Sequence, residues 1–216
     1  MRAVFRAQLD QCVDQLATMC DLAVTAMRDA TSALHNADLG LAERVVADDV
    51  RLDRARAVCE ERAYSLLALQ SPVARDLRVI LAAVQSADTL ERMGDLAKHV
   101  AEAVRRRHPR PVLPAPIRPT VATMAHAAID LAETAGAVIR HPDLALCGSV
   151  TRGDDAVNAQ HSHLLALLTS EDWPYGVQPA VDVAQLSRWY ERYADHAVSL
   201  ARRTMFVTTG RRDDAA

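Results

Sequence analysis

The stretch LERMGDLAKHVA, residues 90–101, returns near the end of the chain as YERYADHAVSLA, residues 190–201. The glutamate, the arginine, the aspartate and two alanines are identical in the two stretches. Met93 and Val100 also have apolar counterparts in the second stretch. The two stretches therefore predict an internal duplication, in which each copy ends with the same kind of helix.

A second pair of segments supports the duplication. The segment PDLALCGSVTRGDDAVN, residues 142–158, aligns without gaps on ADLGLAERVVADDVRLD, residues 37–53. The spacing between these segments is 105 residues, and it falls to 100 in the stretches above, so the second copy needs a shorter connection. Asp38, Val45 and Asp49 match Asp143, Val150 and Asp154.

Apolar residues recur at steps of three and four through residues 9–34, which is the 3.6-residue period of an amphipathic helix. Further helical patterns cover about residues 38–69, 72–107, 118–140, 143–169 and 180–208. We expect Ser71 to cap the helix over 72–107, with Pro72 in its first position. Helices of roughly 30 residues would be about 45 Å long and can pack as an antiparallel bundle.

Proline marks the boundary between the two copies. Five of the nine prolines fall in HPRPVLPAPIRP, residues 108–119, which we expect to form a stiff, extended linker. The predicted fold is all-α, with two tandem antiparallel three-helix bundles related by duplication. Its predicted parts are a first bundle over residues 1–107, a linker over 108–117, a second bundle over 118–210 and a tail over 211–216.

The composition agrees with a helical protein and excludes several functions. Half of the 216 residues are apolar but only 4% are aromatic, whereas strands favour aromatic and β-branched residues. The formal net charge of −3 offers no basic field for nucleic acid. The N-terminus has no signal-peptide pattern, and no stretch approaches the roughly 18 apolar residues of a membrane span. We therefore expect a soluble, cytoplasmic protein.

Cysteine and histidine carry weaker signals. Cys12, Cys20, Cys59 and Cys147 form no C-x-x-C pair and lie in helical patterns, so we interpret them as small apolar residues. His196 takes the place of Leu96 in the other copy, which favours a packed histidine over a ligand.

Paired carboxylates are the feature most suggestive of chemistry. Glu91-x-x-x-Asp95 recurs as Glu191-x-x-x-Asp195, and residues four apart share one face of a helix. The preceding helices carry Asp49-x-x-x-Asp53 and Asp154-x-x-x-Asn158. We call Glu91, Asp95, Asp49 and Asp53 the first cluster, and Glu191, Asp195, Asp154 and Asn158 the second cluster. Such oxygen ligands suit divalent or trivalent metal ions, with Mg, Mn, Fe and Zn as candidates.

Other interpretations of the acidic pairs stay open. They could form a solvated surface of an interaction module that binds no metal, because Lys98, Glu102 and Arg92 lie beside the first pair on the helical wheel. A carboxylate-bridged, metal-dependent helical enzyme is a further alternative. The ferritin-like form of such an enzyme needs Glu-x-x-His pairs, and no glutamate here has a histidine three residues later.

The segments LQSPVARDLRVILAAV…TLERMGDLAKHVAEAV, residues 69–104, and YERYADHAVSLARRTMFVTTG, residues 190–210, resemble PhoU-type phosphate transport regulators. The resemblance implies two three-helix bundles and a homodimer. It also implies a cytoplasmic regulator without enzymatic activity. Such a protein acts between the ATPase of the phosphate ABC transporter and the phosphate-sensing histidine kinase, and it restrains uptake and the starvation response when phosphate is plentiful.

The resemblance also implies multinuclear metal clusters. It assigns Glu91 and Asp95 to one metal cluster and Glu191 and Asp195 to the other, with further ligands from the neighbouring helices at Asp49, Asp53 and Asp154. The chain departs from the family pattern where a third acid is common, since Thr89 and Trp189 stand there, and Asn158 replaces an acid. A PVARDLR segment is absent from the second half. We therefore expect weaker metal binding in the second bundle.

Overall fold

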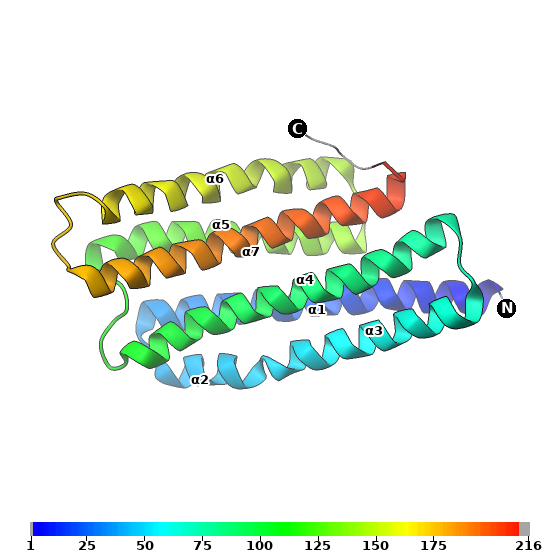
Figure 1. Ribbon diagram of the computed structural model, residues 1–216, viewed down its shortest axis with the longest axis horizontal. Helices are drawn as coiled ribbons and strands as arrows, with labels where there is room; N and C mark the ends of the chain where they lie inside the picture. Colours follow the sequence, from blue (N-terminus) through cyan, green and yellow to red (C-terminus); the bar gives the residue numbers. More distant parts are fainter. Residues whose placement is uncertain (1, 212–216) are drawn as a thin grey trace.

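The computed structural model describes residues 2–211. Most of them lie in long helices that run nearly along one axis (Figure 1). The elements, in chain order, are α1 (Arg2–Asn36), α2 (Leu39–Asp48), α3 (Val50–Gln70), α4 (Ala74–Arg107), the short 3₁₀ helix η1 (Ala115–Ile117), α5 (Arg118–Arg140), α6 (Leu144–Leu168) and α7 (Val177–Thr209). The fold is all-α, as the composition and periodicity predicted.

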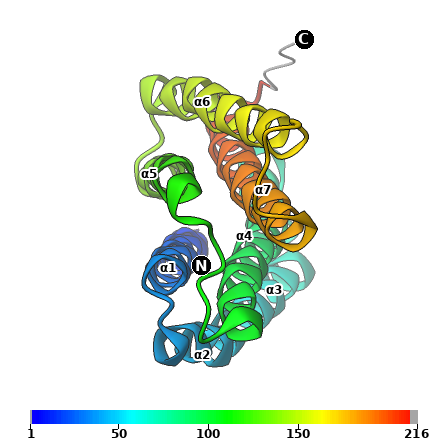
Figure 2. The same ribbon diagram turned by 90° about the vertical axis from the view of Figure 1, so that its left-hand side faces the viewer.

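The helices form two bundles that lie side by side. The first bundle packs α1, α4 and the pair α2–α3, and the second packs α5, α6 and α7. Figure 2 shows the bundles from one end, with α5 next to α1 and α7 next to α4. The pairs α1–α5 and α4–α7 therefore make the interface between the two repeats, while α3 and α6 lie on the outer sides.

Matching caps open the second helix of each repeat. The side chain of Asp38 accepts a hydrogen bond from Leu41 N at 2.9 Å, at the start of α2. The side chain of Asp143 accepts from Leu146 N at 3.0 Å, at the start of α6. An aspartate in this position satisfies amide donors that the first helical turn leaves free. The two caps occupy equivalent positions in the aligned sequence, as expected for a duplicated unit.

The helix predicted over residues 38–69 is interrupted in the structure. It divides at Asp49 into α2 and α3, and Asp49 keeps a right-handed helical conformation with φ −53° and ψ −38°. Its carbonyl accepts from Leu52 N at 2.9 Å, a tight 3₁₀-type contact that bends the helix without ending it. The periodicity of the apolar residues passes through this break, which is why the sequence pattern did not reveal it.

Two other helix boundaries differ from the prediction. Ser71 does not cap α4: its backbone is left-handed, with φ 44°, and it ends α3. The helix α4 begins at Ala74, after an extended Val73 whose side chain makes no capping hydrogen bond. The last helix begins at Val177, earlier than predicted, because Pro179 falls in its first turn, where a proline is tolerated.

The proline-rich connection is folded instead of extended. It contains turns and η1, and it buries Val112, Leu113 and Ile117. The apolar residues between the prolines anchor the connection to the bundles, so the prediction of a stiff, extended linker was wrong for this segment.

The core runs the length of both bundles and is built mainly from alanine, leucine, valine and methionine. All four cysteines are buried, in agreement with their interpretation as small apolar residues. Burial raises the pKa of Cys20 to about 12 and that of Cys59 to about 11, so both remain thiols at neutral pH. Within residues 2–211, none of the helices combines the length and apolar character that crossing a membrane requires.

Candidate functional site

The four carboxylates of the first cluster approach one another where α4 packs on α2 and α3. Glu91 and Asp95 lie one turn apart on α4. Asp49 stands at the break between α2 and α3, and Asp53 lies in the first turn of α3. Gly94 permits this close packing, because a Cβ atom there would lie 2.5 Å from Leu52 Cδ1 and 3.5 Å from Asp49 Oδ1.

Burial of these acids and the repulsion between them raise the pKa values of two members of the first cluster. Burial raises the pKa of Glu91, and the charge of Asp95 raises it further. Burial likewise raises the pKa of Asp95, with Asp49 as the next cause. Asp53 contributes to both shifts. The structure thus brings the predicted residues of the first cluster into electrostatic contact, and a cation placed among them would relieve the repulsion.

A basic side chain already contacts the first cluster. Lys98 Nζ donates to Asp49 Oδ2 at 2.6 Å, a short, charge-assisted hydrogen bond. This hydrogen bond is the main cause that raises the pKa of Lys98. The Asp49 side chain is only 9% exposed. One of the two carboxylates from α2–α3 is therefore largely buried and already paired with an ammonium group.

The second cluster forms where α7 packs on α6. Burial raises the pKa of both Glu191 and Asp154, and in each case the charge of Asp195 is the next cause. Asn158 Nδ2 donates to Asp154 Oδ2 at 2.9 Å. Among the described residues, the other oxygen, Asp154 Oδ1, is buried and has no hydrogen-bond partner. The amide at position 158 therefore stays in the cluster as a donor to Asp154.

Two further side chains lie beside the second cluster. Arg188 Nη1 contacts both carboxylate oxygens of Glu191, one turn along α7. His161 on α6 lies near enough to Glu191 to lower its pKa slightly against the larger effect of burial. The ring nitrogen Nδ1 of His161 is 3.1 Å from Ser187 Oγ. These neighbours offset part of the negative charge of the cluster.

The donor atoms of both clusters suit a metal ion, although their present arrangement does not enclose one. In residues 2–211, no group of three or more His, Cys, Asp or Glu side chains could hold a metal ion as those side chains lie. Carboxylate oxygens are nonetheless the ligands that Mg²⁺, Mn²⁺ and iron prefer. The buried, unpartnered Asp154 Oδ1 is an atom that a cation would satisfy. Binding would require the carboxylates to rotate toward a common point.

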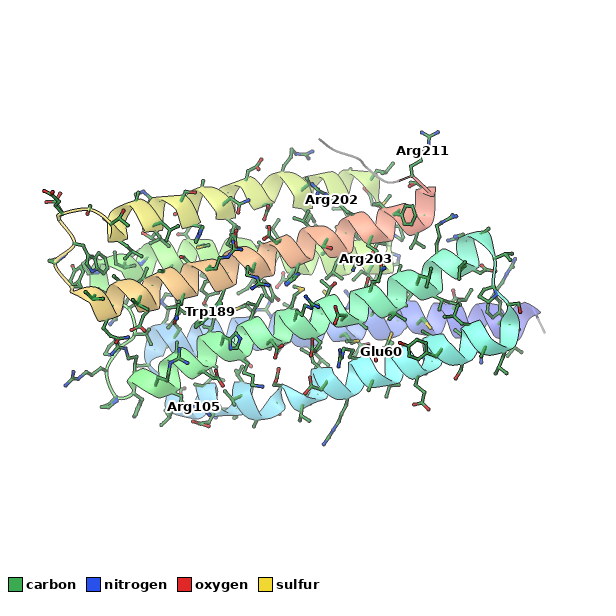
Figure 3. The ribbon with its side chains drawn as sticks, viewed as in Figure 1. Glu60, Arg105, Trp189, Arg202, Arg203 and Arg211 are labelled. Atoms are coloured by element: carbon green, nitrogen blue, oxygen red, sulfur yellow. The ribbon has the colours of Figure 1, made fainter. Side chains whose placement is uncertain are left out.

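The positions that lack a third acid contribute to the interface between the repeats. Arg203 on α7 donates to Thr89 Oγ1 at 3.2 Å and to Ser86 Oγ at 3.3 Å, both on α4. Trp189 packs against His99 on α4, with their ring centroids 5.5 Å apart and the ring planes tilted by 36°. Figure 3 shows Trp189 and Arg203 along the boundary between α7 and α4. Thr89 and Trp189 thus join the two bundles, outside the contacts of either cluster.

Sequence reasoning missed the basic partners of the clusters. On the helical wheel, Lys98 beside the first acidic pair indicates only a solvated surface. Its contact with Asp49 is made at the boundary between α2 and α3, which no sequence pattern marked. Arg188 precedes Glu191 by three residues, so the helical spacing alone could have identified that contact.

The fold and the clusters define a class: a helical protein of two tandem bundles with one carboxylate cluster in each. The chain belongs to the PhoU family, because the family model described as the PhoU domain matches residues 16–104 and again residues 121–204. The two matched ranges contain all the residues of the first and second clusters.

Relatives and solved structures agree with this assignment. The phosphate-specific transport system accessory protein PhoU homolog 2 of Mycobacterium bovis is 45% identical over 210 residues, which cover 97% of this chain and 99% of the relative. PhoU homolog 1 of Mycobacterium leprae is 44% identical over 97% of this chain and 95% of its own length. The crystal structure of PhoU from Pseudomonas aeruginosa matches with a TM-score of 0.86 and 26% identity, covering 96% of this chain and all of that one.

A more distant structure extends the fold comparison. The crystal structure of the phosphate transport system regulatory protein PhoU from Streptococcus pneumoniae matches with a TM-score of 0.87 at 20% identity. The match covers 97% of this chain and 99% of that one, so the arrangement of both bundles is shared over the full length.

Proposed function

We propose that the protein is an accessory regulator of phosphate transport that acts in the cytoplasm by protein contact, and not an enzyme. In this proposal it restrains phosphate uptake and the phosphate-starvation response when phosphate is plentiful. Its partners would be the ATPase of the phosphate ABC transporter and the sensor histidine kinase of the response. We further propose that it works as a homodimer.

The full-length similarity to PhoU homologues named as phosphate-specific transport system accessory proteins carries this proposal. The alignment at 45% identity covers both bundles, so it includes the residues of the interface between the repeats as well as those of each repeat. The duplicated fold adds support, since the PhoU domain matches twice in one chain.

We also propose that the two clusters bind metal ions. Glu91, Asp95, Asp49 and Asp53 would hold metal in the first bundle, and Glu191, Asp195 and Asp154 in the second. A bound ion would supply positive charge and fix the orientation of the helices that carry these ligands. The arrangement of the acids supports this proposal, because α4 and α7 each present two acids on one face, and α2–α3 and α6 present the facing oxygens.

Affinity capture from the native cell tests the proposed partners. A tagged copy, expressed from its own promoter, is isolated from cells grown in high phosphate, and the bound proteins are identified by mass spectrometry. We expect the transporter ATPase or the histidine kinase to be recovered. Recovery of neither, from cells in which both are present, would contradict the proposed contacts. A tagged helical protein of similar charge serves as the control for non-specific capture.

A further inference from the structure

We infer that Lys98 is a resident cation of the first cluster, which neutralises Asp49 and must be displaced before a metal ion can use that carboxylate. The inference rests on the metal binding proposed above. It concerns a residue that is no metal ligand itself but limits how tightly the cluster holds a metal.

The contact is specific and partly buried. Lys98 lies three residues after Asp95 on α4, so its side chain leaves the helix on the same face as the acidic pair. From there its ammonium reaches Asp49 across the helix interface, 2.6 Å from Oδ2. The Lys98 side chain is 33% exposed and the Asp49 side chain is 9% exposed. Water therefore screens this ion pair less than a pair on the open surface.

The choice of lysine is itself informative. Lys98 is the single lysine of the chain, in which the other 24 of the 25 basic residues are arginines. An arginine binds a carboxylate through a planar fork with two parallel hydrogen bonds, whereas lysine offers a point charge on a flexible stem. A lysine can leave the carboxylate by rotating about its own bonds, and its exposed side gives the ammonium a path to water. A lysine at this position is therefore a cation that a metal ion can replace.

The second repeat lacks this cation. Val198 occupies the position of Lys98, and Asp154 occupies that of Asp49. Asp154 receives a hydrogen bond from the neutral Asn158, and its Oδ1 has no partner among the described residues. The same carboxylate position thus forms an ion pair with an ammonium group in the first cluster, whereas in the second cluster it receives a neutral donor and the charge of Arg202 acts on it without an ion pair.

The basic neighbour of the second cluster stands elsewhere. Arg188 contacts Glu191 on its own helix, and its side chain is 54% exposed. The equivalent position in the first repeat is Asp88, which pairs with Arg92 at 3.2 Å. The ion pair within each cluster is therefore made at a different acid, Asp49 in the first repeat and Glu191 in the second, while Arg56 acts on Glu91 and Arg202 acts on Asp154 through their charge. Within residues 2–211, the aspartate at this position of the facing helix forms an ion pair in the first repeat, at Asp49, and none in the second, at Asp154.

Because a charge-assisted hydrogen bond has to be broken first, the first cluster should bind metal about tenfold more weakly than it would without Lys98. Its four carboxylates suggest a much tighter site than the three of the second cluster. Lys98 reduces the difference in metal affinity between the two clusters. At the first cluster, a metal ion has to compete with the Lys98 ammonium for Asp49.

Titration with Mn²⁺ of the full chain tests the inference. The variant Glu191→Gln/Asp195→Asn leaves the first cluster as the site under study. In this background Lys98→Met removes the charge and keeps the length of the stem, and Lys98→Arg keeps the charge. We expect Lys98→Met to bind Mn²⁺ about tenfold more tightly, and Lys98→Arg to bind no more tightly than the background protein. Thermal unfolding without metal checks that all three proteins are folded.

Chemical labelling of the unmutated protein gives a second, independent measurement. Because the chain has one lysine, an amine-acetylating reagent reports on Lys98 in a single peptide, which mass spectrometry quantifies. We expect Mn²⁺ to increase the acetylation rate of Lys98 several-fold, since displacement frees the amine from Asp49. Glu91→Gln/Asp95→Asn, in which the metal ligands of α4 are removed, should abolish the increase.

The outcomes separate this inference from the proposed metal binding. If Mn²⁺ binds the background protein but neither Lys98→Met nor the labelling rate responds, Lys98 is not a competing cation and the inference is wrong. Metal binding by the clusters would stand in that case. If Mn²⁺ binds neither the unmutated protein nor any variant, the proposal of metal binding falls, and this inference with it.

Discussion

The hydroxyl groups of Thr31 on α1 and Tyr190 on α7 lie 2.9 Å apart in the interior, and this contact joins the first repeat to the second. Tyr190 is completely buried and Thr31 is 5% exposed. Burial raises the pKa of Tyr190, so its phenol stays neutral and able to donate. Since water does not reach the pair, each hydroxyl depends on the other for its hydrogen bond.

Removing one of these hydroxyls should destabilise the whole molecule. We expect Tyr190→Phe and Thr31→Val each to lower the free energy of unfolding by about 1–2 kcal/mol, because one partner is left buried without a hydrogen bond. The double variant should lose less than the sum of the two, because it leaves neither hydroxyl unsatisfied. Urea unfolding followed by circular dichroism measures all three values. Strictly additive losses would contradict a direct contact.

The carboxylate clusters should make the metal-free protein sensitive to pH. Burial and the neighbouring Asp95 raise the pKa of Glu91 above its ordinary value of 4.5. The folded state therefore holds this proton more tightly than the unfolded chain does. The contribution of Glu91 to stability is then largest below pH 4.5 and is lost as the pH rises through the raised pKa.

We accordingly expect Glu91→Gln to gain stability relative to the unmutated protein as the pH rises from about 4 to 7. Thermal unfolding in the presence of a chelator measures the difference between the two proteins at each pH. Glu61→Gln, on the exposed side of α3, serves as the control and should show no such trend. A difference for Glu91→Gln that shrinks as the pH rises would have the wrong sign for this account.

His196 should change the stability with pH in the direction opposite to that of Glu91. It lies half-buried on α7, and burial lowers its pKa below 6.5, with Arg192 and Arg92 as the next causes. Because the unfolded chain binds the proton more readily, stability is lost as the pH falls through 6.5 toward the lowered pKa. Its counterpart in the first repeat is Leu96.

The matched substitution is therefore His196→Leu. We expect this variant to be increasingly more stable than the unmutated protein as the pH falls from 7 to 5, as measured by thermal unfolding. His163, which is exposed on α6, provides a comparison in His163→Leu. An unchanged difference for His196→Leu across this range would show that the folded protein protonates His196 as easily as the unfolded chain.

Much of the fold could be predicted from the sequence because its signals are local and repeated. The 3.6-residue period placed the long helices, and the alignment of Asp38 with Asp143 matched two positions that the structure shows to be the caps of α2 and α6. The break at Asp49 and the left-handed Ser71 were missed, because both depend on how the chain passes between packed helices. Local preferences at those two positions allowed a continuous helix and a cap instead.

The clusters were predictable in part, for a related reason. The four-residue spacing of Glu91 and Asp95 fixes a shared helix face, so this pair follows from the sequence alone. That this pair lies close to Asp49 could not be predicted, because it depends on how α4 packs on the boundary between α2 and α3. The role of Lys98 could not be predicted either, since it depends on a tertiary contact formed at that boundary.

Expression of the phosphate-starvation genes is the sharpest test of the proposed regulatory role. The gene is deleted in its native organism, and transcripts of the phosphate regulon are measured in cells grown with plentiful phosphate. We expect expression to rise to a level near that of starved cells, and a plasmid copy of the unmutated gene to restore repression. Expression that stays fully repressed after the deletion would contradict a regulatory role in phosphate transport.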